Sequence, residues 1–315
     1  MNFGIILSSL FAAIWLVLLL NATAPMSELL WMNALVQAVL FTSVACIPFL
    51  RTGRMSYVDI AWPFGVALIG VQILLFGEAD PVRRMIAGGI YLFIGLRMGI
   101  GALLVGKSTG VIFKTEFPRY QYRRMLLEKH DSSHARLHML LEIIAQGMAN
   151  ASVLALPGFI IAVYGTGPVT GIEIAGLIIW AVAYLLETIA DAQKMLFLSK
   201  NQEGVCNIGL WRYSRHPNYF SEWMVWTGLV VGASSSWWQA ASQESLPVWI
   251  LSGVGALLAS VMLYITLVYL TGVKPAEYYS ARKRAGYTDY QKSTNRFFPW
   301  FPNKDPVGSP EALRR

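Results

Sequence analysis

The sequence predicts an all-α integral membrane protein: a single bundle of about seven to eight transmembrane helices, with cytoplasmic loops and a basic C-terminal tail. Of its 315 residues, 55% are hydrophobic and only 14% are charged, and the mean hydropathy is +0.49. A soluble domain of this length could not cover so much apolar surface with polar side chains. The helices must therefore be solvated by lipid.

Eight apolar stretches have the length of a bilayer-spanning helix, which needs roughly 17 to 25 mostly apolar residues. They cover residues 3–20, 29–50, 57–76, 84–106, 139–163, 171–197, 218–235 and 246–271. The first lacks the basic start of a signal peptide, so we expect it to be a retained anchor. We expect residues 1–55 to form N-terminal anchor helices, residues 56–303 one membrane domain and residues 304–315 a flexible tail.

The distribution of basic residues predicts the orientation. With a cytoplasmic N-terminus, 21 of the 25 Lys and Arg residues fall on the cytoplasmic side, two fall opposite, and Arg97 and Lys194 lie within spans. The positive-inside rule therefore places both termini in the cytoplasm, beneath the inner membrane of a bacterium or the endoplasmic reticulum of a eukaryote. The same rule accounts for the net charge of +7, so we expect membrane lipids and no nucleic acid as partners.

Ionisable residues inside the apolar stretches are costly and mark candidate sites. Asp59 opens the third stretch, where it is either functional or part of an ordinary helix start. Arg97 lies deeper and needs a partner or an anionic ligand. Glu187, Asp191 and Lys194 recur at i, i+4 and i+7, so they share one helix face. That face is either the wall of a site or holds a simple ion pair between Asp191 and Lys194.

The densest polar motif follows that face and reads GLWRYSRHPNYFSEW over residues 209–223. Pro217 suits the first turn of a helix, and helix N-termini attract phosphate or carboxylate groups. Arg212 and Arg215 stand just before this turn, so the motif predicts an anion site. Stop-transfer charges and an interfacial aromatic belt are the alternative. That alternative leaves Asn218 and Glu222, which are i and i+4 inside the span, unexplained.

The tail alternates aromatic rings with cations. Such a segment can stack a purine and hold phosphates, or it can lie flat on anionic lipid. Three histidines, His130, His134 and His138, share one helix face, but they lack the converging carboxylates or cysteines of a metal site. The cysteines, Cys46 and Cys206, form no paired motif either. We therefore expect no metal. The residues of the tail pattern are Lys274, Tyr278, Tyr279, Arg282, Lys283, Arg284, Tyr287, Tyr290, Lys292 and Arg296.

The 210–223 run, preceded by ETIADAQK over residues 187–194, resembles the C-terminal half of the steroid 5-alpha-reductase family, in particular its bacterial, largely uncharacterised membrane branch. The tail from Tyr278 to Trp300 and the segment from Asp59 to Trp62 fit as well, so the resemblance covers residues 56–303. Sterol reductases and isoprenylcysteine carboxyl methyltransferases carry similar Arg-His-Pro-x-Tyr runs. The motif thus indicates a superfamily and no single reaction.

The resemblance implies an NADPH-dependent oxidoreductase acting on CH-CH groups, like a 3-oxo-5-alpha-steroid 4-dehydrogenase. It would reduce a carbon–carbon double bond conjugated to a carbonyl in a steroid-like or other lipid substrate that enters from the bilayer. An S-adenosylmethionine-dependent methyltransferase and a non-enzymatic lipid transporter or binding protein are the alternatives. The expected cofactor-binding residues are Asp191, Lys194, Lys200, Arg212, Arg215, His216, Asn218, Tyr219, Glu222, Tyr278, Arg282, Tyr287 and Tyr290.

The substrate side of the expected site departs from the family. The animal enzymes place a Gln-Glu pair and a tyrosine in their N-terminal half to polarise the steroid carbonyl, and the matching place here has no such pair. We expect nearby polar residues to substitute for it. The expected catalytic residues are Asp59, Tyr57, Tyr213 and Glu222, and the expected substrate-binding residues are Trp62, Arg97 and Glu187.

Overall fold

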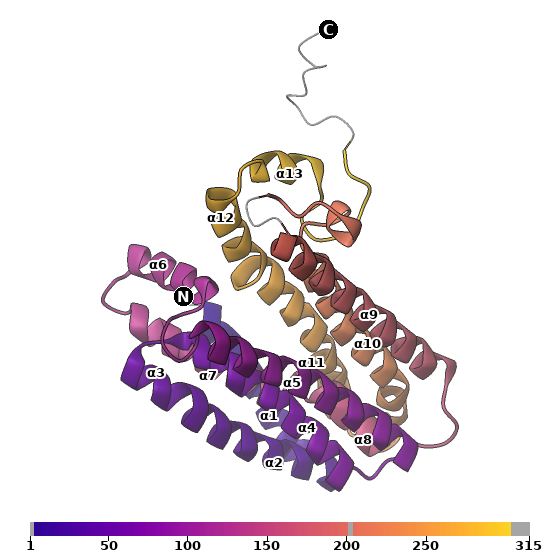
Figure 1. The fold of residues 1–315 in the computed structure, drawn as a ribbon. Helices are drawn as coiled ribbons and strands as arrows, with labels where there is room; N and C mark the ends of the chain where they lie inside the picture. The colour runs from indigo at the N-terminus through magenta and orange to yellow at the C-terminus, as the bar shows by residue number, and fades with distance from the viewer. Residues whose placement is uncertain (1–2, 201–203, 304–315) are drawn as a thin grey trace. The chain divides into compact units, whose positions relative to one another are not determined.

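A computed structural model describes residues 3–200 and 204–303, and apart from one β-bridge between Val111 and Thr115 the regular elements in these ranges are helices (Figure 1). The all-α prediction is confirmed. The α-helices are α1 Phe3–Asn21, α2 Ala24–Phe41, α3 Ile47–Thr52, α4 Val58–Phe76, α5 Pro81–Thr109, α6 Pro118–His130, α7 Ala135–Ala151, α8 Leu156–Tyr164, α9 Gly171–Lys200, α10 Pro217–Ala240, α11 Leu246–Ile265, α12 Val273–Lys283 and α13 Tyr287–Ser293.

Shorter helical turns connect several of these elements. Two are π-helical, Thr42–Cys46 and Thr266–Leu270, and they join α2 to α3 and extend α11. Two are 3₁₀ turns, Met55–Tyr57 before α4 and Gly209–Arg212 before α10. Through the two π-helical turns, α2 continues into α3 and α11 continues toward α12, so that each pair forms one long apolar stretch.

The protein is a multi-pass membrane protein. In the described residues, six helical stretches are long and apolar enough to cross a bilayer: Ala24–Thr52, Met55–Phe76, Pro81–Thr109, Ala135–Tyr164, Gly171–Lys200 and Leu246–Lys283. Each of the eight predicted stretches lies on helices, although a turn at residues 152–155 divides the stretch 139–163 between α7 and α8. However, the apolar part of α1 is shorter than these six stretches. Helix α10 is not among the six either, and it carries several serines and Glu222. The span count and the side of each terminus stay predictions.

The chain divides into two compact units. Unit 1 contains Met1–Gly176 and Leu229–Val261, and unit 2 contains Leu177–Gly228 and Met262–Arg315. The domain boundary expected after residue 55 is not tested by this division and stays a prediction. The expected flexible tail, residues 304–315, lies outside the described residues.

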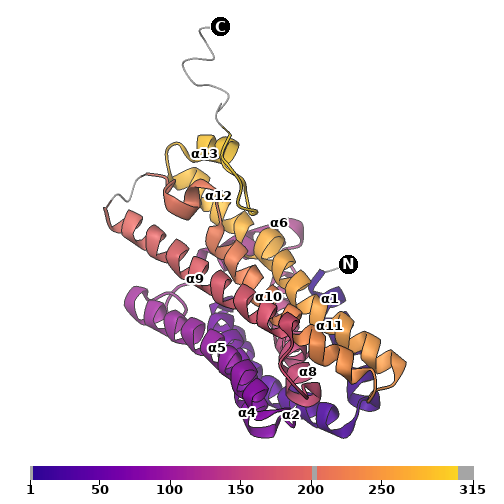
Figure 2. The same ribbon diagram turned by 90° about the vertical axis from the view of Figure 1, so that its right-hand side faces the viewer.

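In unit 1, α4 and α5 lie side by side along a seam of small residues (Figures 1 and 2). A Cβ placed on Gly95 of α5 would lie 2.4 Å from both the Ala67 nitrogen and the Pro63 carbonyl oxygen of α4. A Cβ on Gly70 would lie 2.6 Å from the Gly88 carbonyl oxygen. Small residues that allow backbones to meet in this way are typical of helix pairs in membranes.

Buried carboxamides bind α2, α4 and α7 of unit 1 to one another. Asn33 Nδ2 donates to the Asn150 carbonyl at 2.9 Å, and Gln37 Nε2 donates to Asn33 Oδ1 and to the Gly65 carbonyl, both at 3.0 Å. Asn150 Nδ2 donates to the Trp62 carbonyl at 3.0 Å. Since Asn33, Gln37 and Asn150 are nearly fully buried, these hydrogen bonds replace the water that the interior lacks.

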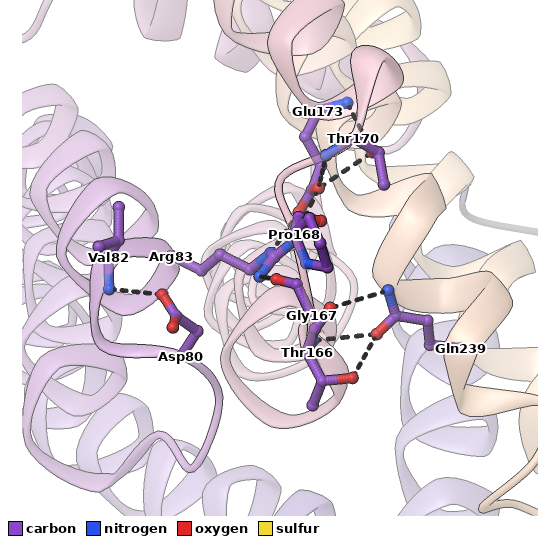
Figure 3. Close-up of polar contacts among 9 residues, drawn as sticks. All are labelled: Asp80, Val82, Arg83, Thr166, Gly167, Pro168, Thr170, Glu173 and Gln239. Carbon is purple, nitrogen blue, oxygen red and sulfur yellow. Dashed lines mark hydrogen bonds and ion pairs between the residues drawn. The ribbon is translucent and has the colours of Figure 1, made fainter.

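A buried arginine joins the start of α5 to the loop before α9 (Figure 3). Arg83 Nε lies 2.6 Å from a Glu173 carboxylate oxygen, and its two terminal nitrogens donate to the Gly167 and Pro168 carbonyls at 2.7 and 2.8 Å. Arg83 is only 4% exposed. The sequence placed Arg83 among ordinary loop charges, and its partner 90 residues away explains why it is buried instead.

Candidate functional site

Residues 209–216, which lead into Pro217 at the start of α10, are called the Arg-His-Pro segment. The segment lies in unit 2 between the end of α9 and the helices α12 and α13. Figures 1 and 2 show α12 and α13 beside the Gly209–Arg212 turn and the N-terminal end of α10. The motif, the acidic face of α9 and the tail were singled out separately in the sequence. The structure brings all three together.

Two hydrogen bonds fix the segment to α9. Trp211 Nε1 donates to the Ala190 carbonyl at 2.8 Å, and the Leu210 nitrogen donates to Gln193 Oε1 at 2.9 Å. Gly209 has a φ of +53°, and a Cβ there would lie 2.3 Å from Gln193 Nε2. The backbone conformation therefore favours glycine at this position, and any larger residue would also have to displace the Gln193 carboxamide.

The predicted cofactor residues Asp191, Lys194 and Asn218 meet at this junction. Asn218 Nδ2 donates to Asp191 Oδ1 at 3.1 Å, while the buried Asn218 Oδ1 accepts no hydrogen bond. Within residues 3–200 and 204–303, Lys194 forms no ion pair, so the simple pair with Asp191 is not found. The Lys194 ammonium lies 4.1 Å from the centroid of the Trp211 ring.

Arg215 and His216 are buried and fasten the segment to the tail. Arg215 Nε donates to Glu277 Oε1 at 2.7 Å, and one of its terminal nitrogens donates to the Gln291 and Thr294 carbonyls at 2.8 and 2.6 Å. His216 Nε2 lies 3.3 Å from the same Glu277 oxygen. Glu277 was missed by the sequence reasoning, although residues 272–303 carry only two carboxylates, Glu277 and Asp289, in a strongly basic stretch.

His216 is held in its neutral form. Burial lowers the pKa of the imidazole below its ordinary value, and this effect outweighs the opposing effect of the hydrogen bond that the imidazole donates to Glu277. The ring also stacks on Tyr219, with the ring centroids 5.3 Å apart and the planes within 7° of parallel. His216 therefore fixes the position of the Tyr219 ring at the start of α10.

The predicted tail tyrosines divide into buried and accessible ones. The Tyr290 hydroxyl donates to the Trp211 carbonyl, and burial raises its pKa. Burial also raises the pKa of Tyr287 to about 12. Tyr278 is half-buried, and the exposed Arg282 guanidinium lies 3.5 Å from the centroid of its ring. Of these three tyrosines, Tyr278 is the one that, together with Arg282, presents a ring and a cation to a ligand.

The remaining predicted residues of unit 2 lie around this junction. Arg212 and Lys200 are exposed, and Tyr213 is 38% exposed with its ring packed edge-on against Phe301 at 6.0 Å. Glu222 follows Asn218 by one helical turn and Glu187 precedes Asp191 by one turn; both are half-buried.

The predicted substrate-side residues other than Tyr213, Glu187 and Glu222 belong to unit 1. Asp59 forms an ion pair with Arg119 at 2.8 Å and accepts a hydrogen bond from the Tyr120 hydroxyl at 2.9 Å. Its second oxygen, Oδ2, is buried and accepts no hydrogen bond. Burial, aided by the nearby Asp59 charge, raises the pKa of Tyr120 well above its ordinary value.

Tyr57, Trp62 and Arg97 are also half-buried in unit 1. The Tyr57 hydroxyl accepts a hydrogen bond from Arg54 at 2.7 Å. Trp62 lies on α4 and Arg97 on α5, the two helices of the glycine seam. Their roles toward a substrate stay predictions.

The three histidines near residue 134 do not converge on one point. His134 Nδ1 lies 2.9 Å from Asp131 Oδ2, while the His134 and His138 rings are 6.4 Å apart. Hydrogen bonds from Ser133 and then His134 lower the pKa of the Asp131 carboxyl to about 2. Across the described residues, no group of three His, Cys, Asp or Glu side chains could hold a metal ion.

Comparison with known proteins gives one finding. The family described as "Protein of unknown function (DUF1295)" matches residues 45–294, a range that includes the glycine seam, the Arg-His-Pro segment and most of the tail. No curated protein and no solved structure matches the chain.

Proposed function

The chain belongs to the DUF1295 family, and we propose that it is a membrane-embedded reductase that uses NADPH to reduce a carbon–carbon double bond conjugated to a carbonyl in a steroid-like or other lipid substrate. The observation that carries this proposal is the junction of Asp191, Asn218 and Lys194. There, an acceptor and a cation lie beside the turn that carries Arg212.

The groups present fit a ligand with a carboxamide and several phosphates. Asn218 Oδ1 is buried without a donor, and a buried unpaired acceptor is costly unless a ligand or water supplies one. Neither Lys194 nor Arg212 forms an ion pair among the described residues, so both cations are available to phosphate oxygens. A basic site of this kind favours the extra phosphate of NADPH over NADH.

The residues would act mainly by binding and orienting. Arg212, Lys200 and Arg282 would hold the phosphates, Tyr278 would stack the purine, and Asn218 would receive the carboxamide. Arg215, His216 and Glu277 keep the segment in place. When bound, NADPH would supply the hydride.

Tyr213 is the predicted hydrogen-bond donor that unit 2 itself carries, and its donation to the substrate carbonyl would be most effective in a site that excludes water. Access from the bilayer would suit an apolar substrate.

Thermal stabilisation of the detergent-purified protein by NADPH, NADH and S-adenosylmethionine tests the proposal, because a ligand that binds only the folded state raises its melting temperature. We expect NADPH to give the largest shift. A shift with S-adenosylmethionine alone would make the protein a methyltransferase. No shift with any of the three would favour a lipid transporter or binding protein.

The residue assignment has its own control. We expect Asn218→Ala to reduce the shift with NADPH, while Asn207→Ala, which removes an exposed asparagine of the same unit, leaves it unchanged. Retained tight binding of NADPH by the Asn218→Ala, Glu222→Ala double variant would show that the assignment is wrong.

A further inference from the structure

We propose that residues 298–301 form a rigid aromatic anchor that inserts into the interface of the bilayer, with Lys274 and Arg296 binding anionic lipid headgroups beside it. The proposal concerns a surface of unit 2 that the proposed reaction does not use, and it is independent of that reaction. Its starting point is the exposure of three large apolar side chains: Phe298 is 53% exposed, Trp300 71% and Phe301 72%.

The backbone that carries these rings is held in place on both sides. The Trp300 nitrogen donates to the Tyr213 carbonyl at 3.0 Å, and Ser214 Oγ donates to the Phe297 carbonyl at 2.8 Å. The Asn303 nitrogen donates to the Ser293 carbonyl at 2.9 Å. The exposed rings thus stand on a fixed segment, and fixing them there in water would gain no hydrophobic stabilisation.

The segment lies beside the end of an apolar span. Phe298 packs against Trp223 and Tyr264, with ring centroids 5.9 and 6.1 Å apart. Tyr264 is the last but one residue of α11, whose apolar stretch begins at Leu246. Aromatic residues next to the end of a span lie at the level of the lipid headgroups, where their apolar faces and polar edges are both satisfied.

Two cations complete the surface. Arg296 and Lys274 lie over the ring of the exposed Tyr269, with their charged ends 5.6 and 5.8 Å from its centroid. Both are exposed, and neither forms an ion pair with a carboxylate in residues 3–200 and 204–303. Unpaired cations beside exposed aromatic rings complement an anionic membrane surface, which attracts Lys and Arg side chains near it.

The depth of a spin label tests the proposal in the full chain. Cys46 and Cys206 are first replaced by alanine, and a nitroxide is then attached at Trp300→Cys or, as a control, at the exposed Thr288→Cys of α13. The protein is reconstituted into phosphatidylcholine vesicles with or without phosphatidylglycerol. The collision rates of the label with oxygen and with a water-soluble nickel chelate are then compared, because oxygen concentrates in the bilayer and the chelate in water.

We expect the oxygen-to-nickel ratio at position 300 to exceed that at position 288 several-fold, and to rise further with phosphatidylglycerol. The Lys274→Gln, Arg296→Gln double variant should lose only the further rise. Equal ratios at the two positions would overturn the anchor, as would a label at 300 that neither reagent reaches. A high ratio that ignores phosphatidylglycerol would overturn the assignment of the two cations.

Discussion

Replacing Gly95 with alanine should push α4 and α5 apart, whereas the same replacement at Gly89, six residues earlier on α5, should not. A Cβ at position 95 would lie 2.4 Å from the Ala67 nitrogen and the Pro63 oxygen, about 1 Å closer than an ordinary van der Waals contact allows. Both atoms belong to the α4 backbone, so no side-chain rotation can relieve the clash. A Cβ at position 89 meets nothing within 4 Å.

The expected free energies follow from these distances. Overpacking costs typically about 1–3 kcal/mol, and a clash with backbone belongs at the upper end, about 3 kcal/mol. Alanine regains about 1 kcal/mol over glycine in a helix interior at either position. Gly95→Ala should therefore lower the free energy of unfolding by about 2 kcal/mol, and Gly89→Ala should raise it by up to about 1 kcal/mol.

Unfolding of both variants by sodium dodecyl sulfate in mixed micelles, followed by tryptophan fluorescence, measures this difference. The two substitutions are chemically identical and lie on one helix, so the propensity gain cancels between them. If Gly95→Ala were as stable as Gly89→Ala, the close approach of α4 and α5 would not exist in the folded protein.

Two further predictions concern the tail. Glu277→Gln should destabilise the protein by about 3–5 kcal/mol in the same unfolding assay, because it leaves the buried Arg215 without a counter-charge. As a control, Asp289→Asn breaks an exposed ion pair with Lys292 and should change the free energy of unfolding little. Burial holds the pKa of His216 in the folded protein below its unfolded value of about 6.5. As the pH drops through about 6.5, the unfolded chain therefore binds a proton at this residue before the folded protein does, and the stability of the fold should decrease. A His216→Gln variant with an unchanged pH dependence would contradict this reasoning.

Helix positions could be predicted from the sequence because a span needs a long apolar run, and each of the eight predicted runs lies on helices. Pro217 also marked the start of α10 correctly, since a proline at the first helical position loses no hydrogen bond. The break between α7 and α8 was not foreseen. Residues 139–163 are mostly apolar, and apolarity alone does not reveal where a helix is interrupted.

Partners far apart in the sequence limited the prediction of the site. The meeting of Asp191 and Asn218 could be anticipated, because each lies on a polar face of an otherwise apolar helix. The ion pair between Arg215 and Glu277 could not, since 62 residues separate them and one glutamate among the basic residues of 274–296 gives no periodic signal. Burial of a charge depends on tertiary partners, which periodicity does not report.

The different burial of its two arginines also refines what the Arg-His-Pro motif does. Arg215 donates its hydrogen bonds to Glu277 and to two tail carbonyls. If Arg215 bound a phosphate instead, these buried acceptors would be left unpaired, which is costly. Arg212, three residues earlier, is exposed and carries no such constraint. One arginine of the motif therefore closes the tail onto the start of α10, and the other remains available for an anion. Under the proposed function, the motif would serve as a structural clamp through Arg215 and as a binding surface through Arg212.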